Sequence, residues 1–150
     1  MKFFHKSKIL ISVKHIIVER VVDIEMFRKK SNKIVESYAH LGIIKKCEGA
    51  KFFGQESLGV RQVRGNGVLL LTNDELIFEY WVPKRILRIP ISKIHGLEQT
   101  KWHLKKTKGV NLLKVRFTNK ENEEDSGAWW VTDIEDWNKF LESLINKNIE

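Results

Sequence analysis

The sequence predicts an α+β protein that is mainly β, in which about seven antiparallel strands form a barrel capped by a C-terminal helix and preceded by an N-terminal helical extension. Three observations predict this class. Residues 1–41 contain no Gly or Pro, whereas all nine Gly and both Pro follow. From residue 42 the apolar residues recur with a period of two, and a helical period returns only after residue 133. Because Gly and Pro interrupt regular structure, we expect a helical amphipathic extension at 1–41 and a strand-rich domain at 42–150.

The extension carries one apolar stripe at helical spacing. Its members are Leu10, Val13, Ile17, Ile24, Phe27, Ile34, Tyr38 and Leu41. Gly42 follows at the position where glycine commonly ends a helix. Four β-branched residues lie off the stripe: Ile16, Val18, Val21 and Val22. Such residues are mediocre helix formers, so a strand across residues 8–18 is the alternative, with Asp23 capping a shorter helix.

The strand-rich domain is divided by polar breaks. The expected strands are residues 43–55, 67–72, 76–82, 85–91, 97–104, 112–118 and 126–131. Alternation turns one face of the sheet to the core. The expected core positions are Leu69, Leu71, Leu76, Phe78, Leu87, Ile89 and Ile91. In the last strand, Trp129 and Trp130 are expected to point to opposite faces.

A C-terminal helix is predicted at residues 134–147, with Asp133 as its cap. Its apolar stripe consists of Ile134, Trp137, Leu141, Leu144 and Ile145. A stripe of this width packs on a sheet. We therefore expect Trp137 to be buried against the barrel.

A run of residues in the middle of the chain resembles a known family. The run has the pattern G-x-L-x-L-T-x-x-x-L-x-F, formed by Gly67, Leu69, Leu71, Thr72, Leu76 and Phe78. Ile89-Pro90-Ile91, the Ala128-Trp129 strand and the helix that carries Trp137 follow in the same order. Over residues 43–146 the chain is similar to the GRAM branch of the pleckstrin-homology-like (PH-like) superfold. The resemblance implies a barrel that binds lipid, peptide or protein, because this superfold hosts several functions.

The composition favours anionic partners and a cytoplasmic location. The formal net charge is +8, and residues 1–45 hold ten Lys and Arg against four Asp and Glu. Such an excess suits nucleic acid, acidic lipid or acidic protein. No uncharged apolar stretch is long enough to predict a transmembrane helix. The single cysteine, Cys47, excludes an intramolecular disulfide and fits a reducing cytoplasm, including the cytoplasmic face of a membrane.

No pattern predicts catalysis. The five histidines lack metal-ligand spacing, and no G-x-S-x-G, P-loop or G-x-G-x-x-G motif occurs. We therefore expect no enzymatic activity, no metal and no cofactor. An acidic run, Glu121, Glu123, Glu124 and Asp125, is expected to be a solvated hairpin loop.

Two basic clusters are candidate binding sites. Relatives that bind phosphoinositides hold basic residues in the loop between the first two strands and in the loop between the third and fourth strands. The matching residues here are Arg61, Arg64, Lys84, Arg85 and Arg88. Arginine suits phosphate because it can pair with two oxygens at once. The acidic run departs from the lipid-binding pattern because it would repel a headgroup. The second cluster is Lys101, Lys105, Lys106 and Lys108, with Trp102 and His103 between.

These features predict a non-catalytic binding or adaptor module that acts at the cytoplasmic membrane face or through self-association. Its expected partner is a protein or a second copy, bound through the N-terminal extension, with anionic lipid as a further ligand. The alternative is a basic nucleic-acid-binding domain, because the second cluster mixes lysines with Trp102. The same tryptophan would be explained by packing on the barrel. The apolar stripe must be covered by the barrel, a second copy or a bilayer, and we expect self-association ahead of the others.

Overall fold

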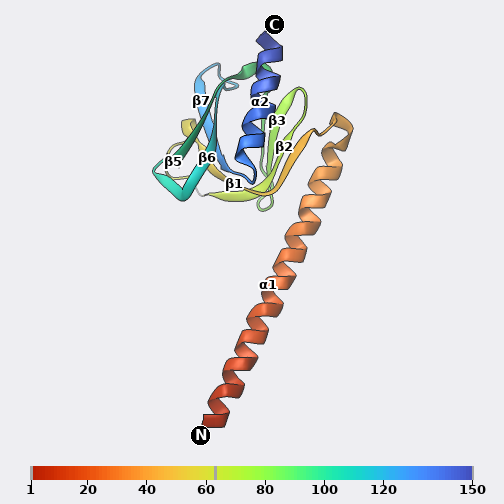
Figure 1. Cartoon of the computed structure of the whole chain (residues 1–150), viewed down its shortest axis with the longest axis vertical. Coiled ribbons are helices and arrows are strands. Elements are labelled where there is room, and N and C mark those ends of the chain that lie inside the picture. Colours follow the sequence, from red (N-terminus) through yellow and green to blue (C-terminus); the bar gives the residue numbers. More distant parts are fainter. Residues whose placement is uncertain (1, 63, 150) are drawn as a thin grey trace.

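The computed structural model describes residues 2–62 and 64–149, with side chains from residue 12 onward. The chain begins with a long helix, α1 (Lys2–Tyr38), and ends with α2 (Ile134–Ile149) (Figure 1). Between them lie β1 (Lys45–Gln55), β2 (Gly65–Leu71), β3 (Glu75–Tyr80), β4 (Ile86–Pro90), β5 (Ile94–His103), β6 (Lys106–Thr118) and β7 (Glu124–Trp130). Three short 3-10 helices are η1 (Ala39–Leu41), η2 (Glu56–Leu58) and η3 (Ile91–Lys93).

The seven strands form one antiparallel sheet in the order β4-β3-β2-β1-β7-β6-β5. Strand β1 joins its two halves. The first residues of β1 pair with β2, as in Lys45 with Leu71, and later residues also pair with β7, as in Phe52 with Trp129. A bulge between Glu48 and Ala50 bends β1. The sheet therefore curls into a half-barrel, and with α2 it forms a PH-like fold, which confirms the predicted class.

The core lies inside the curled sheet. Six of the predicted core residues are buried there, and Leu87 packs against them partly buried. Trp129 stacks on Phe52 with ring centroids 4.8 Å apart, whereas Trp130 joins a separate cluster on the outer face. Trp137 of α2 is 1% exposed within the core. The C-terminal helix thus closes the half-barrel through its predicted apolar stripe.

Helix α1 is continuous from Lys2 to Tyr38. The alternative of a strand across residues 8–18 is therefore wrong, and Asp23 lies inside the helix instead of capping it. The β-branched residues there lower helix propensity only slightly, and no Gly or Pro breaks the hydrogen-bond ladder. After η1, Gly42 takes a left-handed conformation with φ 73°, and its N–H donates to the carbonyl of Ala39.

The C-terminal part of α1 packs on the outer face of β2 and β3. Ile34 and Tyr38 are buried in a cluster with Val68, Leu70 and Ile77. This explains why residues 68–71 are apolar without alternation: the barrel core covers one face of β2, and α1 covers the other.

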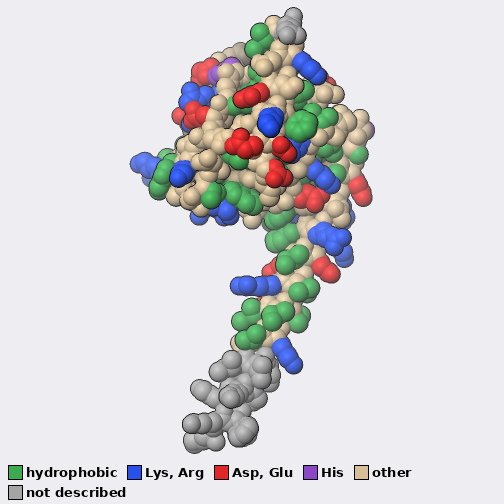
Figure 2. Space-filling model, viewed as in Figure 1, with side chains coloured by type: hydrophobic (Ala, Val, Ile, Leu, Met, Phe, Trp, Pro, Cys, Tyr) green, Lys and Arg blue, Asp and Glu red, His purple; other side chains and the backbone are tan. Residues whose placement is uncertain are grey.

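The N-terminal part of α1 projects beyond the barrel (Figure 1). Along it, hydrophobic side chains face solvent (Figure 2). Val13 is 47% exposed, Ile17 55% and Ile24 66%. In the part of the chain that the structure describes, no helix has the length and apolar character needed to span a membrane.

The acidic run is only partly a solvated loop. Glu121, Glu123 and Glu124 are exposed, and Glu124 lies 3.0 Å from Nε2 of His95. Asp125, however, belongs to β7 and is 3% exposed. The prediction that Asp125 is solvated is wrong, because it points towards polar groups of the β1–β2 connection that the local sequence does not reveal.

Candidate anion-binding surface

Three cations from separate segments meet on the outer face of the sheet: Lys51 of β1, Arg64 just before β2, and Lys108 of β6. We call them the cationic cluster. Burial lowers the pKa of Lys51, and the charges of Arg64 and Lys108 lower it further. None of the three forms an ion pair with any residue that the structure describes. The cluster therefore holds positive charge that the described part of the protein does not neutralise.

Aromatic rings lie beneath two of these cations. The Lys108 ammonium is 4.6 Å from the ring centroid of Trp130, and the Arg64 guanidinium carbon is 5.5 Å from that of Phe53. Phe53 is buried with Leu112 on this outer face, and Trp130 packs against them. Cation–π contacts of this kind hold a basic side chain over an apolar surface without cancelling its charge.

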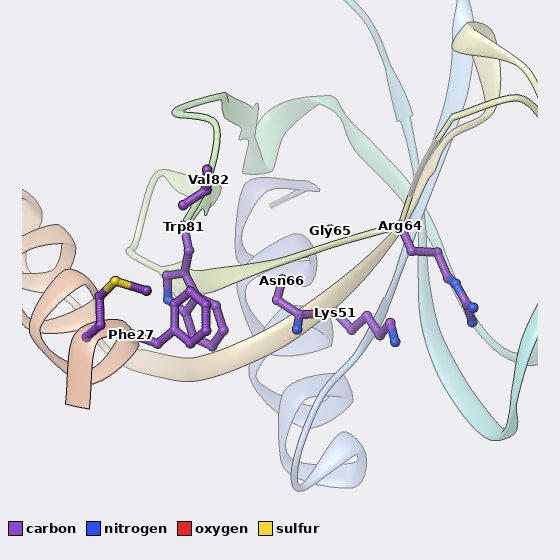
Figure 3. Close-up of a pocket in the computed structure, with 8 residues that line it drawn as sticks. Phe27, Lys51, Arg64, Gly65, Asn66, Trp81 and Val82 are labelled. Atoms are coloured by element: carbon purple, nitrogen blue, oxygen red, sulfur yellow. The ribbon is translucent and has the colours of Figure 1, made fainter. Parts of the chain in front are cut away.

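A groove of about 650 Å³ runs beside the cationic cluster, between α1 and the sheet. It is lined by Met26, Phe27, Lys51, Arg64, Gly65, Asn66, Trp81 and Val82. In Figure 3, Lys51 and Arg64 extend to the side away from Phe27 and Trp81. The groove therefore has one cationic end and one apolar end.

The apolar end of the groove is formed by contacts between α1 and Trp81. Phe27 stacks on Trp81 with ring centroids 4.5 Å apart and 15° between the planes. The indole N–H of Trp81 donates to the hydroxyl of Ser31 over 2.8 Å. These contacts join α1 to the end of β3, so that the groove exists only while α1 is docked.

The β5–β6 hairpin brings its lysines to the β1–β2 connection. His103 Nε2 lies 2.9 Å from the carbonyl oxygen of Gly54, and Lys106 donates to the carbonyl of Val60 over 3.1 Å. Arg64 in turn donates to the carbonyl of Thr107 over 3.4 Å. Burial lowers the pKa of His103, which favours its neutral form. The hairpin thus places Lys108 of the second predicted basic cluster beside Arg64 of the first.

The five residues predicted to bind a headgroup do not converge on one pocket. Arg64 lines the groove, whereas Arg88 lines a second cavity of about 580 Å³ between β4 and the β6–β7 loop. Arg88 donates to both carboxylate oxygens of Glu75, over 3.0 and 2.6 Å, and these bonds raise its pKa. Arg85 lies over the ring of Tyr80, at 5.7 Å. Arg61, Lys84 and Arg85 are exposed on loops.

The predicted stripe on α1 is divided. Phe27, Ile34, Tyr38 and Leu41 pack on the barrel, whereas Val13, Ile17 and Ile24 are exposed. The side chain of Leu10 lies outside the described residues.

Sequence reasoning missed Lys51 and Trp81 as groove residues. The one feature of the sequence that could have indicated Lys51 is its position on the outward-facing side of its strand. Among the side chains that the structure describes, in residues 12–62 and 64–149, no three of His, Cys, Asp or Glu gather as metal ligands.

No protein-family model and no curated protein matches this sequence. Among solved structures, the chain is similar to the C-terminal domain of an unknown protein from Leishmania infantum, with 14% identity, 79% of this chain and 94% of that chain covered, and a TM-score of 0.53. It is also similar to a chain of the 8S snRNP assembly intermediate (11% identity, 71% and 81% covered, TM-score 0.51). A third similar chain is Vav1, bound to an allosteric inhibitor (12% identity, 82% and 33% covered, TM-score 0.50). At these identities the likeness concerns the fold alone.

Proposed function

We propose that the chain is a non-catalytic binding module that docks on an anionic membrane surface at the cytoplasmic face. The cationic cluster carries the proposal. Lys51, Arg64 and Lys108 repel one another, and no described carboxylate offsets that repulsion. This repulsion lowers the stability of the free protein, and a bound anion would reduce it.

The groove supports a lipid headgroup as the anion. Arg64 can pair with two phosphate oxygens, and Lys51 supplies a compact charge beside it. At the other end, Phe27 and Trp81 offer apolar surface of the kind that settles at a membrane interface. A phospholipid presents both features in the same order, phosphate next to apolar chain.

We further propose that the module belongs to the GRAM branch of the PH-like superfold. Its motif residues have structural roles that fit this assignment. A Cβ atom at Gly67 would overlap the carbonyl oxygen of Glu79 on the neighbouring strand, so only glycine fits there. Leu71 and Phe78 of the same motif are buried in the core.

Vesicle co-sedimentation tests the membrane proposal. The full chain should bind vesicles that contain phosphatidylserine, should not bind neutral phosphatidylcholine vesicles, and should bind less as salt screens the charges. Changing Lys51, Arg64 and Lys108 together to Glu should weaken binding more than about tenfold, because each basic residue near an anionic surface contributes about 1 kcal/mol.

A matched control separates the site from net charge. Lys120, Lys139 and Lys147 are exposed on the β6–β7 loop and α2, so changing all three to Glu alters the charge equally. This variant should keep most of the binding. Equal loss in both variants would mean that binding follows net charge alone, and a wild-type chain that ignores anionic vesicles would contradict the proposed function.

Nucleic-acid binding is the second candidate, because Trp102 is 61% exposed and does not pack on the barrel. Lys101 and Lys105 flank it on the same hairpin. Exposed aromatic and basic residues together suit stacked bases. If single-stranded RNA or DNA shifts the chain in a gel, Trp102→Ala weakens that shift, and vesicles do not bind, this candidate replaces the membrane proposal.

A further inference from the structure

Helix α1 has an apolar face that points away from the barrel. Three valines on the projecting part, Val18, Val21 and Val22, are 60%, 51% and 59% exposed. Lys14 precedes them and Glu25 follows them. At about 100° per residue these five side chains lie within an arc of about 100°. We call them the outward face.

The barrel cannot cover the outward face. The residues of α1 that contact the barrel include Phe27, Ser31, Ile34 and Tyr38, which are spaced by four, three and four. The centre of this contact face lies about 150° around the helix from that of the outward face. Because α1 is one continuous helix, docking its C-terminal part turns the three valines away from the protein.

The outward face is complementary to itself when it is reversed. Along the chain the outward face begins with the ammonium group of Lys14, continues with the three valines and ends with the carboxylate of Glu25. In the opposite direction it begins with that carboxylate. An antiparallel neighbour would therefore place Glu25 opposite Lys14 at each end and valines between them. A parallel neighbour would place Lys14 opposite Lys14, and like charges repel.

We propose that two copies of this chain pair through the outward face of α1 as an antiparallel, two-fold symmetric dimer. The axis passes between Glu19 and Arg20, so that Val18 lies opposite Val21 of the second copy. A two-fold axis needs one self-complementary surface, which this face provides. Valine is small enough to let the helix axes approach to about 8–10 Å.

The charges favour a second copy over a lipid bilayer as the cover of this face. Glu25 lies in the arc of the valines, and its carboxylate would meet anionic headgroups if the face settled on a membrane. In the antiparallel pair the same carboxylate meets an ammonium group. The contact spans only about 16 Å of helix, so association is weak and depends on protein concentration.

Sedimentation equilibrium of the full chain without lipid tests the pairing. The wild-type chain should show a monomer–dimer equilibrium. Lys14→Glu and Glu25→Lys should each weaken it at least about tenfold, because each creates two like-charge contacts per dimer. The double variant should recover dimerisation, because both pairs are then opposite in charge again.

The control is Lys46→Glu, which changes the charge of β1 by the same amount and should leave the equilibrium unchanged. The Lys14 and Glu25 variants should unfold like the wild type, since both side chains are exposed on the part of α1 that projects beyond the barrel. A monomeric wild type, or a double variant as weak as the single ones, would overturn the proposal. In a parallel dimer, the Lys14→Glu variant would merely replace a Lys–Lys contact by a Glu–Glu contact, so charge changes would not alter dimerisation. That result would also overturn the proposal.

Discussion

Asp125 ties β7 to the connection between β1 and β2. Its carboxylate accepts hydrogen bonds from Gln55 Nε2 at 2.6 Å, from the Ser57 hydroxyl at 2.7 Å and N–H at 2.9 Å, and from Asn119 Nδ2 at 3.2 Å. Burial alone raises the pKa of Asp125, but these hydrogen bonds outweigh it and hold the pKa below its usual value. Asp125 is therefore a buried, ionised anchor.

Replacing Asp125 by Ala should lower the free energy of unfolding by about 2–3 kcal/mol, because four donor groups, from Gln55, Ser57 and Asn119, lose their acceptor. Urea denaturation at neutral pH measures the change. Glu123→Ala, in the exposed loop beside it, should stay within about 0.5 kcal/mol of the wild type. Equal effects in the two variants would show that Asp125 is no anchor.

The contribution of Asp125 should also depend on pH. A depressed pKa in the folded protein adds stability above the usual carboxyl pKa of about 4, and this is lost as the pH falls through the folded pKa. The difference in stability between wild type and Asp125→Asn should therefore shrink below about pH 4. A difference that stays constant down to pH 2 would contradict this.

Tyr38 should show the opposite dependence. Burial, followed by its hydrogen bond to Glu79 at 3.0 Å, raises the pKa of Tyr38 to about 12. The folded protein favours the neutral phenol, so this stability is present below pH 10 and is lost as the pH rises towards 12. Chemical denaturation across this range should show a steeper loss for wild type than for Tyr38→Phe, and parallel curves would refute the buried contact.

At the scale of elements, α2 closes the half-barrel through Trp137. Trp137→Ala should cost about 3–5 kcal/mol of unfolding free energy, because it removes a large buried side chain and leaves a cavity. Phe140→Ala, on the exposed side of the same helix, is the control and should change little; Phe140 is 43% exposed. An unchanged denaturation midpoint in Trp137→Ala would disprove the role of α2 as a plug.

The packing of α1 on the barrel leads to a second prediction at the scale of elements. Ile34→Asp places a carboxylate among Val68, Leu70 and Ile77 and should destabilise the whole fold by more than about 3 kcal/mol, since an unpaired charge is costly to bury. Ile24→Asp makes the same change where the side chain is 66% exposed and should leave stability nearly unaltered. Thermal unfolding of both variants distinguishes a docked helix from one that merely lies nearby.

At the scale of the whole molecule, we expect the stability of the barrel to depend on the helix before it, because α1 covers the outer face of β2 and β3. A chain starting at Gly42 would leave the outer faces of Val68, Leu70 and Ile77 in water. It should unfold at lower denaturant concentration than the full chain and aggregate more readily, because a contiguous apolar patch is exposed. Comparison of the denaturation midpoints and of light scattering tests this. An equally stable truncated chain would mean that α1 is dispensable for folding.

Local patterns in the sequence determined the elements. Alternation in a strand and the 3.6-residue period of a helix fix which side chains share a face, and each needs only neighbouring residues. That is why the core positions of β2, β3 and β4, the burial of Trp137 and the opposite orientations of Trp129 and Trp130 were all predicted. The helix–strand ambiguity around residues 8–18 arose because β-branched residues suit both structures locally.

Only the tertiary structure decided what lies on the second face of the sheet. Whether Val68 and Leu70 meet water or α1 depends on the docking of a segment that lies far from them in the sequence, around Ile34 and Tyr38. Period-two alternation carries no information about that docking. The same holds for charge. Lys51, Arg64 and Lys108 belong to three separate segments, and the curl of the sheet brings them together. Arg88, in contrast, forms an ion pair with Glu75. Asp125 sits in an acidic run and yet is buried, because its acceptor atoms meet donors that chain folding delivers from residues 55–57.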